Sequence, residues 1–399
     1  MKKNKGLIIG LIIGLVTGIS ISVFVWSLVT ILSPRTAGSG AASDDSSIDW
    51  AAVDEKLETI KRTIDVYYKD EFNQEDLVDG IYKGFVNGLN DPYSVYYTEE
   101  EYNELMESSS GIYCGIGAYL QQDVDSVSVI RPIPNSPAEE AGMLAGDIIV
   151  KVDDKDVTGE DVTTVAARVR GPENTSVTVE VKRAGEKEPI VFELVRREIE
   201  TPTVVHEVMD DQIGYIAILE FDDITLTQFD TALQELQDGG MTSLVLDLRD
   251  NPGGNLDTVV KIADEFLPKG LIVYTEDKYG VKKEFSSDEA HSLGLPMAVL
   301  INENSASAAE ILAGAIKDYE AGTLVGTTTF GKGIVQQVLP LGDGTGIKVT
   351  TSKYFTPNGN DIHGIGIAPD IELEFDEEAF EKDENADNQL DKAIELLTK

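Results

Sequence analysis

Residues 297–316 read MAVLINENSASAAEILAGAI, in which an apolar strand passes through a polar turn into a helix. Five consecutive apolar residues predict a buried strand, and Ile311, Leu312 and Ile316 continue the pattern as a helix. Ser307 lies where the turn meets the helix, at the positive end of the helix dipole and beside backbone N–H groups that lack helical partners. This position suits a nucleophile whose transition state develops negative charge, although serine is also a common helix cap.

Two further segments carry residues that can do chemistry. Residues 246–255, LDLRDNPGGN, follow an apolar run and contain a glycine pair, where backbone N–H groups can approach a ligand closely. In residues 331–336, GKGIVQ, an extended chain would direct Lys332 and Gln336 to the same side. A desolvated lysine loses its proton easily and can act as a general base, and a glutamine can orient that amine without adding charge.

These three segments fall within residues 198–375, where apolar strands and helical patterns follow one another as in an α/β domain. The expected strands are 213–219, 243–248, 297–301, 324–326 and 347–353, and the expected helices include 227–236 and 258–266.

Residues 111–197 change to short β-rich runs with two short helices between them. Ser136 is an expected N-cap, with proline at the first helical position and Glu139 at the third. The run NSPAEEAGMLAGDII, residues 135–149, resembles the corresponding part of PDZ domains. The resemblance implies a β-sandwich or barrel-like module inserted before the α/β domain.

A module of this kind binds a peptide by strand addition and holds the terminal carboxylate in a turn of backbone N–H groups. A valine-lined wall opposite the turn would favour an apolar terminal side chain. By position, the turn would be Gly115, Ile116 and Gly117, and the wall Val162, Val165 and Val169.

Together, the serine, lysine and glycine segments resemble the C-terminal processing peptidases, which are serine peptidases with a Ser–Lys dyad and an inserted PDZ domain. The resemblance runs from about residue 77 to residue 397 and implies a homodimer. It implies that Ser307 is the nucleophile, Lys332 the general base and Gln336 the residue that orients the base. Backbone N–H groups of Gly253 and Ala308 would form the oxyanion hole.

The first 35 residues predict a membrane anchor. Lys2, Lys3 and Lys5 precede the uncharged residues 6–32, which as a helix would span about 40 Å against a hydrocarbon core of roughly 30 Å. The positive charge keeps the N-terminus in the cytoplasm and sends the rest of the chain outside. A signal peptide cleaved within residues 36–43 is the alternative.

The remaining segments suggest supporting roles. Residues 36–47 are expected to be a flexible linker, and residues 48–107 a helical scaffold or dimerisation region. Residues 376–399 combine an acidic linker with a short amphipathic helix, which either packs on its own domain or joins a dimer interface.

Composition excludes several classes of function. With 72 acidic and 32 basic residues, the net charge of −40 opposes binding to nucleic acid. One cysteine and three scattered histidines offer no disulfide framework and no zinc-peptidase motif, so neither a metal nor another cofactor is expected.

The sequence therefore predicts a membrane-anchored, extracytoplasmic serine endopeptidase whose PDZ domain recognises apolar C-termini of protein substrates. A catalytically inactive PDZ adaptor and a Ser-His-Asp hydrolase are the alternatives. No promising serine lies in a G-x-S-x-G turn, which disfavours the second alternative.

Overall fold

The computed structural model describes residues 48–288, 292–383 and 386–398, which fall into two compact units. The first unit ends at Phe72 and contributes the helix α2 (Trp50–Tyr67); the second comprises Asn73–Lys399. The predicted membrane anchor lies outside the described residues. No helix among the described residues has both the length and the apolar content needed to cross a bilayer.

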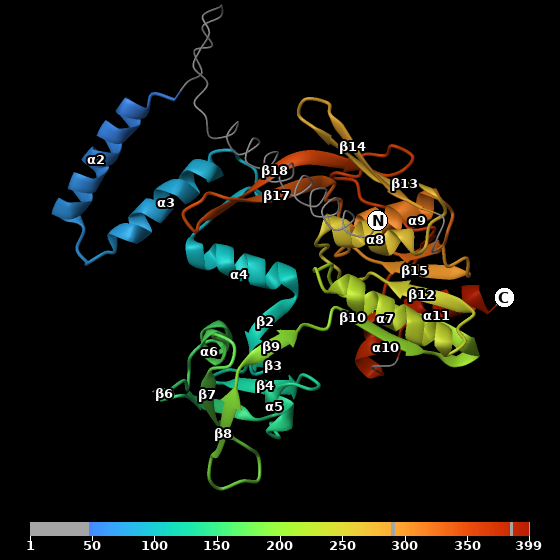
Figure 1. The fold of residues 1–399 in the computed structure, drawn as a ribbon, viewed down its shortest axis with the longest axis horizontal. Helices are drawn as coiled ribbons and strands as arrows, with labels where there is room; N and C mark the ends of the chain where they lie inside the picture. The colour runs from blue at the N-terminus through green and yellow to red at the C-terminus, as the bar shows by residue number, and fades with distance from the viewer. Residues whose placement is uncertain (1–47, 289–291, 384–385, 399) are drawn as a thin grey trace, which may run out of the picture. The chain divides into compact units, whose positions relative to one another are not determined.

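A six-stranded sheet forms the centre of the α/β domain (Figure 1). Five of its strands, β11, β12, β15, β16 and β19, run parallel to one another, and β10 pairs antiparallel with β11 at one edge. In spatial order the strands are β10 (Val204–Val208), β11 (Ile213–Ile218), β12 (Ser243–Asp247), β15 (Met297–Ile301), β16 (Thr323–Gly326) and β19 (Ile371–Glu372). Strands β12 and β15 at the centre are buried at every residue, and so on both faces, as a parallel sheet between helices requires.

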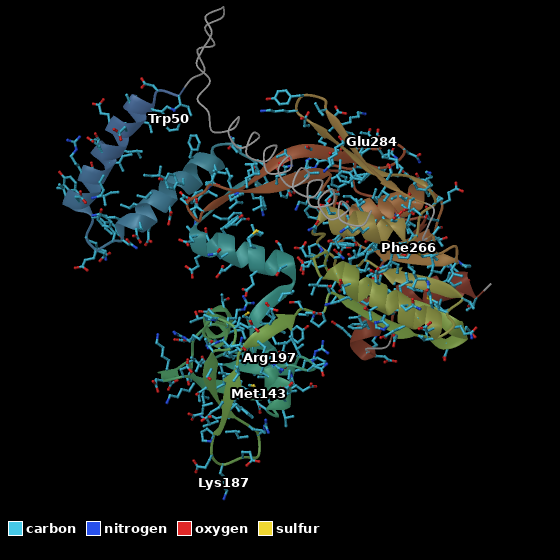
Figure 2. All side chains as sticks on the ribbon, viewed as in Figure 1. Trp50, Met143, Lys187, Arg197, Phe266 and Glu284 are labelled. Atoms are coloured by element: carbon cyan, nitrogen blue, oxygen red, sulfur yellow. The ribbon has the colours of Figure 1, made fainter. Side chains whose placement is uncertain are left out.

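Three helices cover one face of this sheet: α7 (Thr225–Asp238), α8 (Leu256–Asp264) and α9 (Ala308–Asp318). Their apolar side chains pack with alternate strand residues such as Leu246 and Val299, because successive strand side chains point to opposite faces. Phe266, labelled in Figure 2, meets Phe229 edge to face at 5.5 Å within this core. The expected strands and helices of the α/β domain are confirmed to within two residues at each end.

The C-terminal helix α11 (Asn388–Leu397) packs on the opposite face. Ala393 is fully buried there against Val245, Ala298 and Leu300. The helix is therefore buried on its own domain, one of the two placements that its sequence left open. It is preceded by the short helix α10 (Glu377–Lys382), and the 3-10 turn η1 (Asp210–Gln212) precedes β11.

A second sheet joins sequence-distant strands beside the α/β core. Its members are β1 (Val95–Tyr97), β13 (Gly270–Asp277), β14 (Lys282–Ser287), β17 (Ile334–Pro340) and β18 (Gly346–Phe355). Strand β1 lies between α3 (Gln74–Asn87) and α4 (Glu99–Ser110) in the chain and pairs with β18. The helical region expected over residues 48–107 is thus interrupted by a strand at residues 95–97. These residues form a strand because β18 supplies backbone partners that the local sequence does not reveal.

The β-rich module has a sheet and a core of its own. Met143, labelled in Figure 2, is buried in that core together with Val165 and Phe192. The Ser136 side chain accepts from the Glu139 N–H, as expected for an N-cap. The elements are β3 (Ala118–Gln122), β4 (Val127–Pro132), α5 (Pro137–Glu140), β5 (Ile148–Val152), β6 (Lys155–Asp156), α6 (Val162–Val169), β7 (Ser176–Lys182) and β8 (Ile190–Val195), with β2 (Ile112–Gly115) and β9 (Arg197–Glu200) pairing where the chain enters and leaves the module.

Candidate active site

The three chemically promising segments all follow parallel strands of the central sheet. Residues 248–255 follow β12, residues 302–307 follow β15, and residues 327–333 follow β16. These strands are adjacent and parallel, so their carboxyl ends lie at one edge of the sheet. Loops at that edge of an open α/β sheet are where ligands usually bind.

Hydrogen bonds tie the first two loops together. The Asp250 carboxylate accepts from the side-chain amides of Asn302 at 2.9 Å and Asn304 at 2.8 Å. These amides lower the pKa of Asp250. The Ala306 N–H donates to the Asn251 carbonyl at 2.9 Å, so the turn that precedes Ser307 is held against the glycine loop.

Ser307 has an unusual backbone conformation, with φ 55° and ψ −112°. A positive φ in a serine is strained and persists only where the surrounding structure enforces it. Helix α9 begins at the next residue and is buried from Ala308 to Ile316, which fixes the helix end on which Ser307 sits. The surrounding structure therefore holds Ser307 in a strained backbone conformation, which capping a helix does not require.

Glu310 connects the serine turn to the lysine loop and was not among the residues singled out from the sequence. Its carboxylate is fully buried and accepts four hydrogen bonds from both segments. The donors are the Ser307 N–H (2.8 Å), the Thr329 hydroxyl (2.6 Å), the Gly331 N–H (2.7 Å) and the Lys332 N–H (2.8 Å). A glutamate three residues after a helix-starting serine is a capping pattern, which is the signal that could have identified it.

Tyr354 on β18 makes a second connection. Its hydroxyl lies 2.9 Å from the Ser307 carbonyl oxygen and 2.6 Å from the Lys332 carbonyl oxygen. The single hydroxyl proton is shared between these two acceptors. Burial, with the negative charge of Glu310, raises the pKa of Tyr354 well above its usual value, so the group stays a neutral donor. The predicted nucleophile and base are thus brought together through their backbones.

The Lys332 side chain is half-buried. Burial lowers its pKa, and the positive charge of Lys348 lowers it further, whereas Glu310 acts in the opposite direction. Its Nζ lies 5.1 Å from the ring centroid of Tyr93, and within the described residues it donates no hydrogen bond to Ser307 or Gln336. The Gln336 amide instead lies 3.5 Å from the Thr350 hydroxyl, the limit of a hydrogen bond.

Gly253 packs directly on the serine turn, with φ 104°. A Cβ at this position would lie 2.7 Å from the Ser307 Cβ and 2.9 Å from the Ala308 nitrogen, so only glycine fits. The Gly253 N–H donates to the Asn251 side chain at 2.8 Å. Across the described part of the chain, the Ala308 N–H has no acceptor, which leaves it available to an oxyanion.

The predicted peptide groove coincides with a cavity of about 350 Å³. Gly115, Ile116 and Gly117 line it together with Val162 and Val169. Val165, the remaining residue of the predicted groove, does not line the cavity and is fully buried in the module core. The cavity is also lined by Glu107, Arg170, Glu220 and Asp222, and burial with the nearby charges of Glu220 and Asp223 raises the pKa of Asp222 to about 7.

In residues 48–288, 292–383 and 386–398, no three His, Cys, Asp or Glu side chains gather in a way that could hold a metal ion.

Comparison with known proteins adds independent information. The model of Peptidase family S41 matches residues 212–373, the PDZ domain model matches residues 128–183, and the CtpB N-terminal domain model matches residues 32–101. The chain is 36% identical to the carboxy-terminal processing protease CtpB of Bacillus subtilis, over 87% of this chain and 73% of that protein. This protein belongs to the carboxy-terminal processing proteases. It is therefore a serine peptidase of family S41 with a PDZ domain.

Other members of this protease family align similarly. The carboxyl-terminal-processing protease of Synechocystis is 37% identical over 78% of this chain and 74% of its own length. Among solved structures, the photosystem II D1 C-terminal processing protease is 29% identical, with a TM-score of 0.47 over 82% of this chain and 91% of that one.

The buried carboxylate of this processing protease can be tested directly. Each carboxylate oxygen of Glu310 accepts from two donors. In Glu310→Gln an NH2 group replaces one of these oxygens, so two of the donors lose their acceptor whichever way the amide is turned. We expect the free energy of unfolding to fall by about 1–3 kcal/mol and kcat to fall at least tenfold, with KM little changed. Urea unfolding and steady-state kinetics measure these quantities.

Glu303→Gln is the matched control, because Glu303 lies in the same turn region but accepts a single exposed hydrogen bond, from Thr327. Equal unfolding midpoints and equal kcat for the two variants would show that Glu310 does not organise the site.

Proposed function

We propose that this protease is a membrane-anchored, extracytoplasmic endopeptidase that uses Ser307 as nucleophile and Lys332 as general base. The observation that carries the proposal is the shared attachment of both residues to Glu310 and Tyr354. The strained backbone of Ser307 and the lowered pKa of Lys332 support the same assignment.

In the proposed mechanism, the neutral Lys332 amine accepts the hydroxyl proton of Ser307 as the serine oxygen attacks a peptide carbonyl. The developing oxyanion is stabilised by the Ala308 N–H and by Gly253, whose N–H must then be shared with or released from Asn251. The ammonium returns its proton to the leaving amine, and water hydrolyses the acyl-enzyme. The Lys332 side chain has to turn toward Ser307 for the first step, and Gln336 would then orient it.

Ser307→Ala and Lys332→Ala should each reduce cleavage to background while the unfolding midpoint stays near that of the parent. For the parent, kcat/KM should rise with pH as the amine deprotonates. The midpoint of this rise, the acid limb of the profile, should lie below the usual pKa of lysine because burial lowers the pKa of Lys332. An internally quenched fluorescent peptide with an apolar C-terminus serves as substrate.

Lys353→Ala is the control for removing a lysine that is not assigned to the site, since Lys353 lies on β18 and pairs with Asp361 at 2.9 Å. It should keep its activity. Undiminished cleavage by Ser307→Ala would overturn the assignment of the nucleophile.

We also propose that the PDZ domain binds apolar C-termini of protein substrates. The glycine turn beside a partly apolar cavity supports this idea, because backbone N–H groups of such a turn can hold a carboxylate. Amidation of the peptide's C-terminus should weaken its binding at least tenfold, as measured by titration calorimetry with Ser307→Ala. A peptide with an acidic last residue should bind more weakly than one ending in valine. Equal affinity for free and amidated peptides would contradict the proposal.

The proposed anchor rests on the uncharged residues 6–32 and the proposed homodimer on family resemblance. The full chain should remain in the membrane pellet after alkaline carbonate extraction, and a chain that begins at residue 48 should be released. Release of the full chain would refute the anchor.

Light scattering of the released form should give twice the protomer mass. A monomeric mass would refute the homodimer.

A further inference from the structure

Tyr93 lies beside the proposed base although it comes from the N-terminal part of the second unit. It lies between α3 and β1, and its ring centroid is 5.1 Å from the Nζ of Lys332. That distance is within the range of a cation–π interaction. No motif around residue 93 indicates this contact, because it depends on how β1 pairs.

The backbone around Tyr93 is firmly attached. The Asp91 carboxylate accepts from the Tyr93 N–H at 3.0 Å and from the Ser94 hydroxyl at 2.6 Å. The Ser94 oxygen in turn accepts from the Thr350 N–H of β18 at 3.2 Å. Burial by itself would raise the pKa of Asp91, but the hydrogen bonds of Ser94 and Thr350 outweigh this effect and lower the pKa below its usual value. The Asp91 carboxylate therefore stays ionised and continues to accept the hydrogen bonds of this turn.

Strand pairing continues this attachment toward the active site. Val95 pairs with Lys348 on β18, and Gln336 of β17 is aligned with Thr350 on that same strand. The Tyr93 turn and the segment that follows Lys332 are therefore held by one strand, which fixes the ring relative to the lysine.

We propose that Tyr93 is a positioning residue for Lys332: its ring face confines the amine and stabilises the ammonium that forms when the base takes the serine proton. The inference rests on the proposed function of Lys332 as general base. It assigns residues 91–94 a direct influence on the base, beyond the scaffold role expected from the sequence.

The physical effect has a definite sign. An aromatic face attracts the charged form of lysine, so it opposes the effects of burial and of Lys348 on the pKa. The ring also lowers the energy of a transition state in which Lys332 gains positive charge. Among the described residues, Lys348 on β18 and Glu310 on α9 act directly on the pKa of the amine. Further titratable groups on the segments packed against the amine and its loop include Asp91 beside Tyr93, Tyr354 on β18, and Asp361 and His363 of the loop that packs on Gly333.

The test compares Tyr93→Leu with Tyr93→Phe. Tyr93→Leu removes the aromatic face, so the acid limb of kcat/KM against pH should move about half a unit to one unit lower. Its kcat on the alkaline plateau should fall roughly threefold to tenfold, with KM unchanged because Tyr93 does not line the peptide cavity. Tyr93→Phe keeps the face and should leave the pH profile in place.

Tyr279→Leu is the matched control. Its ring is exposed and lies 5.1 Å from the Nζ of Lys278, so the change removes a comparable contact without altering Lys332 or the charged groups that act on its pKa. Its acid limb should stay where it is in the parent. A Tyr93→Leu profile with an unmoved limb, even with reduced kcat, would overturn the proposal, since a merely structural role lowers the rate without changing the pKa.

If Tyr93→Leu does not fold, replacing Tyr93 by mono-, di- and trifluorophenylalanine weakens the π face at nearly constant shape, and the limb should move lower with each added fluorine. An unchanged limb along that series would equally overturn the proposal. Lys332→Ala is measured in the same assay. Cleavage by Lys332→Ala would refute the proposed function itself, whereas an inactive Lys332→Ala with an unmoved Tyr93→Leu limb refutes the present inference alone.

Discussion

The Glu310 carboxylate is fully buried and accepts hydrogen bonds from donors on either side of it, one on the turn of Ser307 and three on the loop of Lys332. A buried carboxylate without partners would be very costly, so both segments must be in place for the charge to be tolerated. The same bonds set the distance between the two loops. The geometry of the proposed dyad therefore depends on this one side chain, with Tyr354 bridging the carbonyls of the same two residues.

The central sheet explains why these loops meet. Strands β12, β15 and β16 are adjacent and parallel, so the glycine loop, the serine turn and the lysine loop leave the sheet at one edge. Close packing of Gly253 on Ser307 requires the absence of a side chain at residue 253. The positive φ of Ser307 shows that the surrounding structure, and not local preference, sets the backbone of the serine.

Membership of the carboxy-terminal processing proteases accounts for a peptidase core and a PDZ domain in one chain. The structure adds the arrangement of Lys332, the proposed base. Its amine faces the ring of Tyr93, and Gln336 lies near Thr350, so the proposed mechanism requires side-chain rotation at positions 332 and 336. If the amine reaches the serine hydroxyl while it stays against the aromatic face, as proposed, residues 91–94 are linked to the chemistry.

Local sequence patterns were sufficient for the strands of the α/β domain, for the helix that starts after Ser307 and for the capped helix at Ser136, because periodicity and caps depend on neighbouring residues. They also marked Lys332 and Gly253 as candidates. They did not reveal the hydrogen-bond partners of Glu310, or the strand β1 that places Tyr93 beside Lys332. Nor did they show that Val165 is buried and that α11 packs on the sheet of its own domain. Those features are set by strand order and long-range backbone pairing, which bring distant segments together and which no local spacing encodes.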